Sequence, residues 1–124
     1  IILSSDCVDI YNPKVVRSTM GAVFRMPFLY VDDLPGTFGE LKKAGIRIYA
    51  AHLEGINAYD REDYREGCAF LIGNEGNGLR NEIAECADCR IRIPMEGKAE
   101  SLNAAVAASV LMFEVSRQRR EHTG

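Results

Sequence analysis

Residues 70–79, Phe-Leu-Ile-Gly-Asn-Glu-Gly-Asn-Gly-Leu, and residues 91–103, Ile-Arg-Ile-Pro-Met-Glu-Gly-Lys-Ala-Glu-Ser-Leu-Asn, decide the fold of this chain. Each stretch is an apolar, strand-like run that breaks into a polar loop and leads into a helical pattern. We expect the two strand-to-loop junctions to stand side by side at the carboxyl edge of one sheet. Because open α/β sheets bind ligands at that edge, the sequence predicts a small-molecule site there.

The rest of the chain alternates between strand-like and helical patterns. Strands are expected at 1–5, 28–31, 46–51, 68–72 and 89–93, and helices at 13–25, 34–44, 79–86 and 101–119. Residues 52–67 are predicted to form a loop with a turn of helix around 60–64. This alternation predicts an α/β fold with a parallel sheet that is covered by helices on both faces.

Several residues mark where these helices begin and end. Asp9 or Asn12 can cap the first helix, and Asp32 or Asp33 the second. Gly45 is expected to end the second helix. The last helix is predicted to carry Ala, Val, Leu and Phe on one side and charged residues on the other. These charged residues are Glu114, Arg117 and Arg119.

Size and charge restrict the class of protein. The chain has 124 residues, which suit a single domain, and a net charge of −3, which does not indicate nucleic-acid binding by itself. Local clusters of basic residues can either bind a polyanion or form solvated helix faces. The chain begins inside a strand-like run, which is typical of a piece of a longer protein.

The cysteines indicate a reducing environment. Four cysteines occur without a signal peptide or a long apolar stretch, so we expect a soluble, cytoplasmic protein. Cys86 and Cys89 form a lone CxxC pair. Because a zinc site needs a second pair or nearby histidines, no metal site is predicted.

The glycine loop suits contact with a ligand. Three glycines between 73 and 78 permit close approach of a ligand to the backbone, and free amides ahead of a helix can bind polar groups. The GxxGxG spacing differs from the dinucleotide-binding GxGxxG pattern. A simple chain-reversing turn remains an alternative. Against it stands Glu75, because a carboxylate at a strand end costs stability unless it is exposed or paired.

The second junction combines a strand end with a helix start. Pro94 blocks further strand pairing. Ser101 is of a type that favours the N-cap position. It could therefore have this structural role and no role in function. Asn103 is expected inside the first helical turn, with its side chain free to face a ligand. The alanines that follow make the helix slim, which permits close approach of a helix or ligand but also fits simple helix propensity.

Together these residues resemble the SpoU (TrmH-type) class of SPOUT RNA methyltransferases. The second motif of that class is similar to Phe70-x-x-Gly73-x-Glu75-x-x-Gly78. The third is similar to residues 93–97, 101–103 and 106–108, followed by Glu114-x-x-Arg117-Gln118. Residues 12–22 resemble the segment that follows the first motif. The match covers essentially the whole chain.

The resemblance implies a C-terminal trefoil knot, an exception to the rule that chains avoid knots, and an S-adenosylmethionine site. It implies that Gly73, Ile93 and Leu102 contact the cofactor through backbone groups and apolar packing. The same pocket would be lined by Leu71, Ile72, Gly78, Pro94 and Met95. It also implies a homodimer with the active site at the subunit interface, which acts on transfer or ribosomal RNA.

The implied reaction is methylation of a ribose 2′-hydroxyl. An arginine of the first motif would serve as base or activator, with Glu75, Ser101 and Asn103 holding that arginine and the ribose-phosphate. That motif is expected before Ile1, so residues 1–124 would form a catalytic domain without its N-terminal strand, helix and first motif. Without the activating arginine, this chain as given could be inactive. Two alternatives remain: a non-catalytic knotted module that binds RNA or a ligand, and a Rossmann nucleotide enzyme.

Overall fold

The computed structural model describes residues 1–5, 7, 9, 11–18, 25–52, 55–73, 79–94 and 103–123. The chain divides into two compact units, Ile1–Thr37 and Phe38–Gly124. The predicted α/β class is confirmed, because every strand pair among the described residues is parallel and helices lie between the strands in sequence.

The first unit contains β1 (Ile2–Ser4), α1 (Pro13–Ser18) and β2 (Leu29–Val31). The two strands pair in parallel, with Ile2 opposite Leu29. Of the two expected caps for α1, Asn12 is the one observed, since its Oδ1 accepts a hydrogen bond from the Lys14 amide at 2.9 Å. Pro13 then supplies the first helical position without needing a donor.

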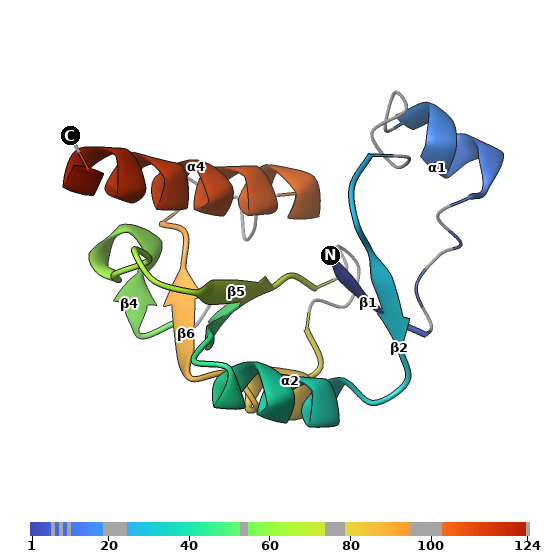
Figure 1. Cartoon of the computed structure of the whole chain (residues 1–124), viewed down its shortest axis with the longest axis horizontal. Coiled ribbons are helices and arrows are strands. Elements are labelled where there is room, and N and C mark those ends of the chain that lie inside the picture. The colour runs from blue at the N-terminus through green and yellow to red at the C-terminus, as the bar shows by residue number, and fades with distance from the viewer. Residues whose placement is uncertain are drawn as a thin grey trace. The chain divides into compact units, whose positions relative to one another are not determined.

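The second unit is built around a four-stranded sheet of order β4-β6-β3-β5. Its strands are β3 (Arg47–Ala51), β4 (Asn57–Ala58), β5 (Cys68–Leu71) and β6 (Cys89–Arg92), with a 3₁₀ turn η2 (Tyr59–Arg61) after β4. The helices are α2 (Leu34–Lys43), which begins in the first unit, α3 (Asn81–Ala84) and α4 (Ala104–Thr123). In Figure 1 the sheet lies between α4 and α2, so helices cover both of its faces as expected.

The sheet has two buried faces because the central strand alternates its side chains. On one face, Tyr49 of β3 packs with Tyr64, Ile91 and Leu111 of α4 in the main core cluster. Ile48 and Ala50 occupy the opposite face and are fully buried. Lys42 of α2 donates from Nζ to the Cys86 carbonyl at 2.7 Å, which links α2 to the end of α3.

The start and end of α2 follow their sequence signals. Asp33 caps the helix, with Oδ1 accepting from the Gly36 amide at 3.1 Å. Gly45 ends it with a φ of 82°, a conformation that residues with a Cβ rarely adopt.

The last helix differs from its prediction in position and in facing. It begins at Ala104, not Ser101, and extends to Thr123. The expected division into an apolar and a charged side is wrong: Phe113 is 73% exposed, whereas Glu114 is only 7% exposed. Glu114 tolerates burial because Arg117 donates to both of its carboxylate oxygens. Strand β4 also lies within residues 52–67, which were predicted as loop.

The trefoil knot stays a prediction, because the loops at 74–78 and 95–102 lie outside the described residues. No helix in the described part of the chain has the length and apolar character needed to cross a membrane.

Candidate functional site

The two motif-bearing strands end at the same edge of the sheet but are not adjacent. Both β5 and β6 pair in parallel with β3, with Leu71 opposite Ala50 and Ile91 opposite Ala51. The expected side-by-side arrangement is therefore wrong, since β3 separates the two strand ends by two strand spacings, roughly 9–10 Å. A ligand that contacts both loops must span the end of β3.

The residues just beyond these strands are partly buried. Ile72 and Ile93 both pack against the core cluster of Tyr49, Tyr64, Ile91 and Leu111. Leu71 lies opposite Ala50 and so belongs to the other face of the sheet. Gly73 is half-buried and Pro94 is exposed. The predicted pocket residues that the structure describes are thus brought to one sheet edge.

The end of β6 is held by a segment that sequence reasoning did not single out. His52 donates its amide to the Ile91 carbonyl at 2.8 Å. A Cβ at Gly55 would lie 2.4 Å from the Ile91 carbonyl carbon, so only glycine fits this close backbone approach. Arg92 Nη1 donates to the carbonyls of Gly55 and Ile56 at 2.9 and 3.2 Å. These contacts fix the strand from which Ile93 and Pro94 emerge.

Asn103 caps α4 instead of lying inside its first turn. Its Oδ1 accepts from the Ala105 amide at 2.9 Å and from the Val106 amide at 3.4 Å, while its carbonyl accepts from Ala107. The expectation of a side chain free to face a ligand is therefore wrong for this oxygen. The side-chain amide nitrogen is the group that can donate to a substrate.

The other predicted site residues lie outside the described residues. They are Glu75, Gly78, Met95, Ser101 and Leu102.

The cysteine pair at 86–89 has separate partners for its two thiols. Cys86 Sγ donates to the Glu82 carbonyl at 3.3 Å, and Cys89 Sγ to Glu62 Oε1 at 3.2 Å. Burial, together with the hydrogen bond to Glu62, raises the pKa of the Cys89 thiol, which makes it a poor nucleophile. No group of three His, Cys, Asp or Glu residues within the described ranges converges as a metal site would require.

A separate open groove of about 790 Å³ runs along α4. Apolar side chains from the first half of the helix and charged ones from the second half line it, together with the η2 turn. Its lining consists of Tyr59, Asp60, Ala105, Val106, Ser109, Val110, Phe113, Glu114, Arg117 and Arg120. Two of these apolar residues are well exposed, Val106 at 48% and Phe113 at 73%. Such a surface suits a partner that carries both apolar and charged groups.

Comparison with known proteins relates the chain to one family. Residues 1–113 match the model of the SpoU rRNA Methylase family. The chain is 34% identical to the 23S rRNA (guanosine(2553)-2′-O)-methyltransferase RlmP of Bacillus subtilis, over 93% of this chain and 46% of that protein. It is 37% identical to the 23S rRNA (guanosine-2′-O-)-methyltransferase RlmB of Xylella fastidiosa, over 96% of this chain and 48% of that protein.

Solved structures give the same result. The SpoU methyltransferase AviRb from Streptomyces viridochromogenes, in complex with the cofactor AdoMet, superposes with a TM-score of 0.86 at 35% identity, over 97% of this chain and 49% of that one. The TrmH/SpoU tRNA modifying enzyme of A. aeolicus superposes with a TM-score of 0.81 at 30% identity, over 99% of this chain and 64% of that one. The chain spans about half the length of the curated relatives it matches.

Proposed function

Because this chain belongs to the SpoU rRNA methylase family, we propose that it serves the transfer of a methyl group from S-adenosylmethionine to a ribose 2′-hydroxyl of RNA. The observation that carries the proposal is the shared edge of the sheet. The strands that lead into the second and third motifs, β5 and β6, lie on either side of β3 and end at this edge. Ribosomal RNA is the favoured target, because the relatives RlmP and RlmB are named for 23S rRNA. Transfer RNA is the second target class, and the cytoplasm is the proposed location.

The described residues fit an S-adenosylmethionine site. Gly73 offers backbone without a side chain, while Ile72 and Ile93 add apolar surface that is already packed against the core. When bound, the cofactor supplies an electrophilic methyl group. We propose that Gly73, Ile93 and Leu102 contact it, within the chain crossing of the implied knot. The proposed lining is completed by Leu71, Ile72, Gly78, Pro94 and Met95.

The remaining motif residues are proposed to act on the acceptor. A ribose hydroxyl is a poor nucleophile and must lose its proton as the methyl group transfers. Asn103, fixed by its capping bonds, can donate from its side-chain nitrogen to the ribose-phosphate. Glu75 and Ser101 are proposed to hold the activating group and the ribose. Since alignment supplies much of the acceleration, rigid placement of these side chains matters more than their acidity.

Calorimetry on the whole natural protein tests the cofactor site. We expect micromolar binding of S-adenosylmethionine or S-adenosylhomocysteine, and binding weakened by about a hundredfold or more in Gly73→Val, because the added side chain fills the pocket. Gly39→Val is the matched control, since the Cβ position at Gly39 has no neighbour within 4 Å. Equal affinity in the wild type and Gly73→Val would refute the assignment.

We also propose that two copies associate through the α4 groove. Phe113 and Val106 are exposed apolar side chains of one groove, and Asp60, Arg117 and Arg120 line the same groove. A surface that carries apolar residues and both charge signs can pair with itself about a two-fold axis. The proposed dimer is supported by the resemblance to a homodimeric family and by the exposed apolar residues of the α4 groove.

Sedimentation equilibrium of the whole protein tests the dimer. Phe113→Asp should weaken association by at least tenfold, because it buries an unpaired charge in the interface. Met112→Asp is the matched control: Met112 is also exposed, at 61%, but does not line the groove. A wild-type protein that stays monomeric at high concentration contradicts the proposal.

A further inference from the structure

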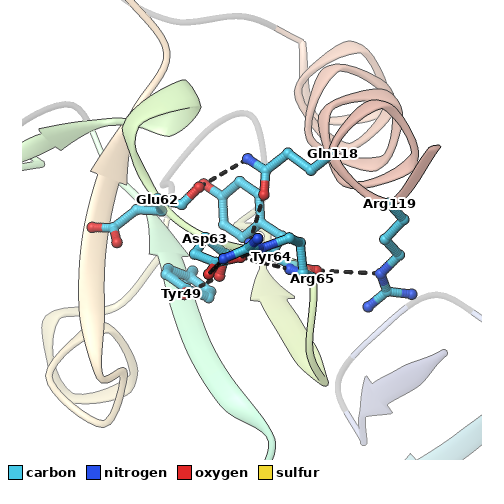
Figure 2. A network of polar contacts seen from close by, with 7 residues as sticks. All are labelled: Tyr49, Glu62, Asp63, Tyr64, Arg65, Gln118 and Arg119. Carbon is cyan, nitrogen blue, oxygen red and sulfur yellow. Dashed lines mark hydrogen bonds and ion pairs between the residues drawn. The ribbon is translucent and has the colours of Figure 1, made fainter. Parts of the chain in front are cut away.

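The carboxyl-terminal half of α4 is bonded to the backbone of the segment Glu62–Glu66. Gln118 Nε2 donates to the Glu62 carbonyl at 2.8 Å, and Gln118 Oε1 accepts from the Tyr64 amide at 2.7 Å. Both ends of one side-chain amide are therefore used on one short segment. Figure 2 shows Gln118 reaching from α4 between these two backbone groups.

Arg119 adds a second attachment one residue later. Its Nε donates to the Tyr64 carbonyl at 3.2 Å and its Nη2 to the Glu66 carbonyl at 3.0 Å. We call Gln118, Arg119 and the backbone groups they bond the α4 clasp. Hydrogen bonds are directional, so the clasp fixes the rotation and axial position of α4 more sharply than apolar packing, which is not directional.

The segment held by the clasp is itself immobilised by the core. Tyr64 is fully buried, and its ring packs edge-on against Tyr49 of β3 and Phe70 of β5, with centroids 5.0 and 5.2 Å apart. The Tyr64 hydroxyl donates to the Tyr59 carbonyl. Through Tyr64, the clasp thus fixes α4 relative to β3 and β5, which both end at the candidate site.

Because a helix moves as a rigid rod, its attachment at the clasp determines the position of Asn103 at its other end. Gln118 lies about 22 Å along α4 from Asn103 at 1.5 Å per residue. A tilt of about 5° at the clasp would shift Asn103 by roughly 2 Å. Misplacement by about 1 Å can cost on the order of a hundredfold in rate when catalysis depends on alignment.

We propose that Gln118, supported by Arg119, is a positioning residue for methyl transfer. The clasp sets the axis of α4, and through it the placement of Asn103. Neither Gln118 nor Arg119 touches the reacting groups in this scheme. The inference rests on the proposed function and deepens it by naming what aligns the acceptor side of the site.

The test compares Gln118→Met, which keeps the length of the side chain but loses both bonds, with the wild type in the whole natural protein. Methyl transfer to RNA is measured at a temperature where circular dichroism shows both proteins fully folded. We expect kcat to fall at least tenfold while KM for RNA changes less than threefold. Glu121→Gln is the control on the same helix, because Glu121 accepts a hydrogen bond from Arg117 and makes no contact with the segment 62–66 in the described part of the chain, so this variant should keep wild-type kcat.

A partial recovery of kcat in a conservative variant distinguishes a positioning role of Gln118 from a role in stability alone. In Gln118→Glu the carboxylate still accepts from the Tyr64 amide but cannot donate to Glu62, so kcat should lie between the wild type and Gln118→Met. If Gln118→Met does not fold, Arg119→Lys replaces it, and a kcat reduced at least threefold with the fold retained supports the inference. A kcat within twofold of the wild type in the folded variants overturns it, even if the melting temperature falls. An inactive wild type that binds no S-adenosylmethionine would instead refute the proposed function.

Discussion

The two ends of α4 are held in different ways. At its amino-terminal end the helix is fixed by its own residue Asn103, whose Oδ1 caps the first turn. Further along, it is fixed near its middle by Leu111 in the core and, in its carboxyl-terminal half, by the clasp of Gln118 and Arg119 on the segment 62–66. Among the described residues, the amino-terminal end therefore depends on one cap, whereas the middle and the distant, carboxyl-terminal half carry most of the tertiary attachment.

This difference predicts that substitutions at the two ends of α4 affect stability and function to different degrees. Changes from Leu111 onward should cost stability and, because they shift the axis of the helix, alignment of the site. Changes at the cap should cost little stability but affect the site directly. The predictions below are ordered by the size of their expected effect on stability.

The largest expected effect comes from removing the core contact near the middle of α4. Leu111 is fully buried in the main cluster. Leu111→Ala should lower the free energy of unfolding by about 2–5 kcal/mol, because it deletes packed apolar volume. Urea denaturation measures this, with the exposed neighbour variant Met112→Ala expected within about 0.5 kcal/mol of the wild type. Equal losses in the two variants would show that α4 is not anchored at Leu111.

A smaller effect is expected at the cap, where two substitutions separate its roles. Asn103→Ala removes the cap and should cost about 1 kcal/mol. Asn103→Asp keeps a capping oxygen and should retain the wild-type melting temperature, yet it lacks the amide donor. Methyl transfer should fall in both variants. Wild-type activity in Asn103→Asp would limit this residue to capping.

The smallest effect concerns the buried carboxylate of the distant half. Hydrogen bonds from Arg117 hold the pKa of Glu114 below its ordinary value. Its stabilising contribution is therefore present above the unfolded pKa of about 4.3 and is lost as pH falls through the lower native pKa. In acid titrations of the free energy of unfolding, Glu114→Gln should show a shallower loss below about pH 4.3 than the wild type. Parallel curves for the two proteins would contradict this role.

The sequence predicted the fold class, and it predicted that both motif-bearing strands end at one edge of the sheet, because motifs and alternating patterns depend on local spacing. Cap and stop signals at Asn12, Asp33 and Gly45 were also confirmed, since each acts within a few residues. The order of the strands was not predictable in this way. Placing β3 between β5 and β6 depends on tertiary pairing, which no local pattern encodes.

The prediction of which side chains of α4 face the core was wrong for a different reason. Binary patterning assigns charged and amide side chains to solvent, but Glu114 is buried against Arg117, and Arg119 bonds backbone carbonyls of the segment 62–66. Conversely, Phe113 is exposed on the groove where patterning placed it inside. Strand β4 was missed because it has only the residues Asn57 and Ala58, too few to establish a period.

One measurement tests the central claim most directly: a crystal structure of the whole natural protein with S-adenosylhomocysteine. The account predicts the ligand at the carboxyl edge of the sheet, spanning the end of β3 and in contact with both Gly73 and Ile93. A ligand bound in the α4 groove, or at the opposite edge near Cys68 and Cys89, would contradict it.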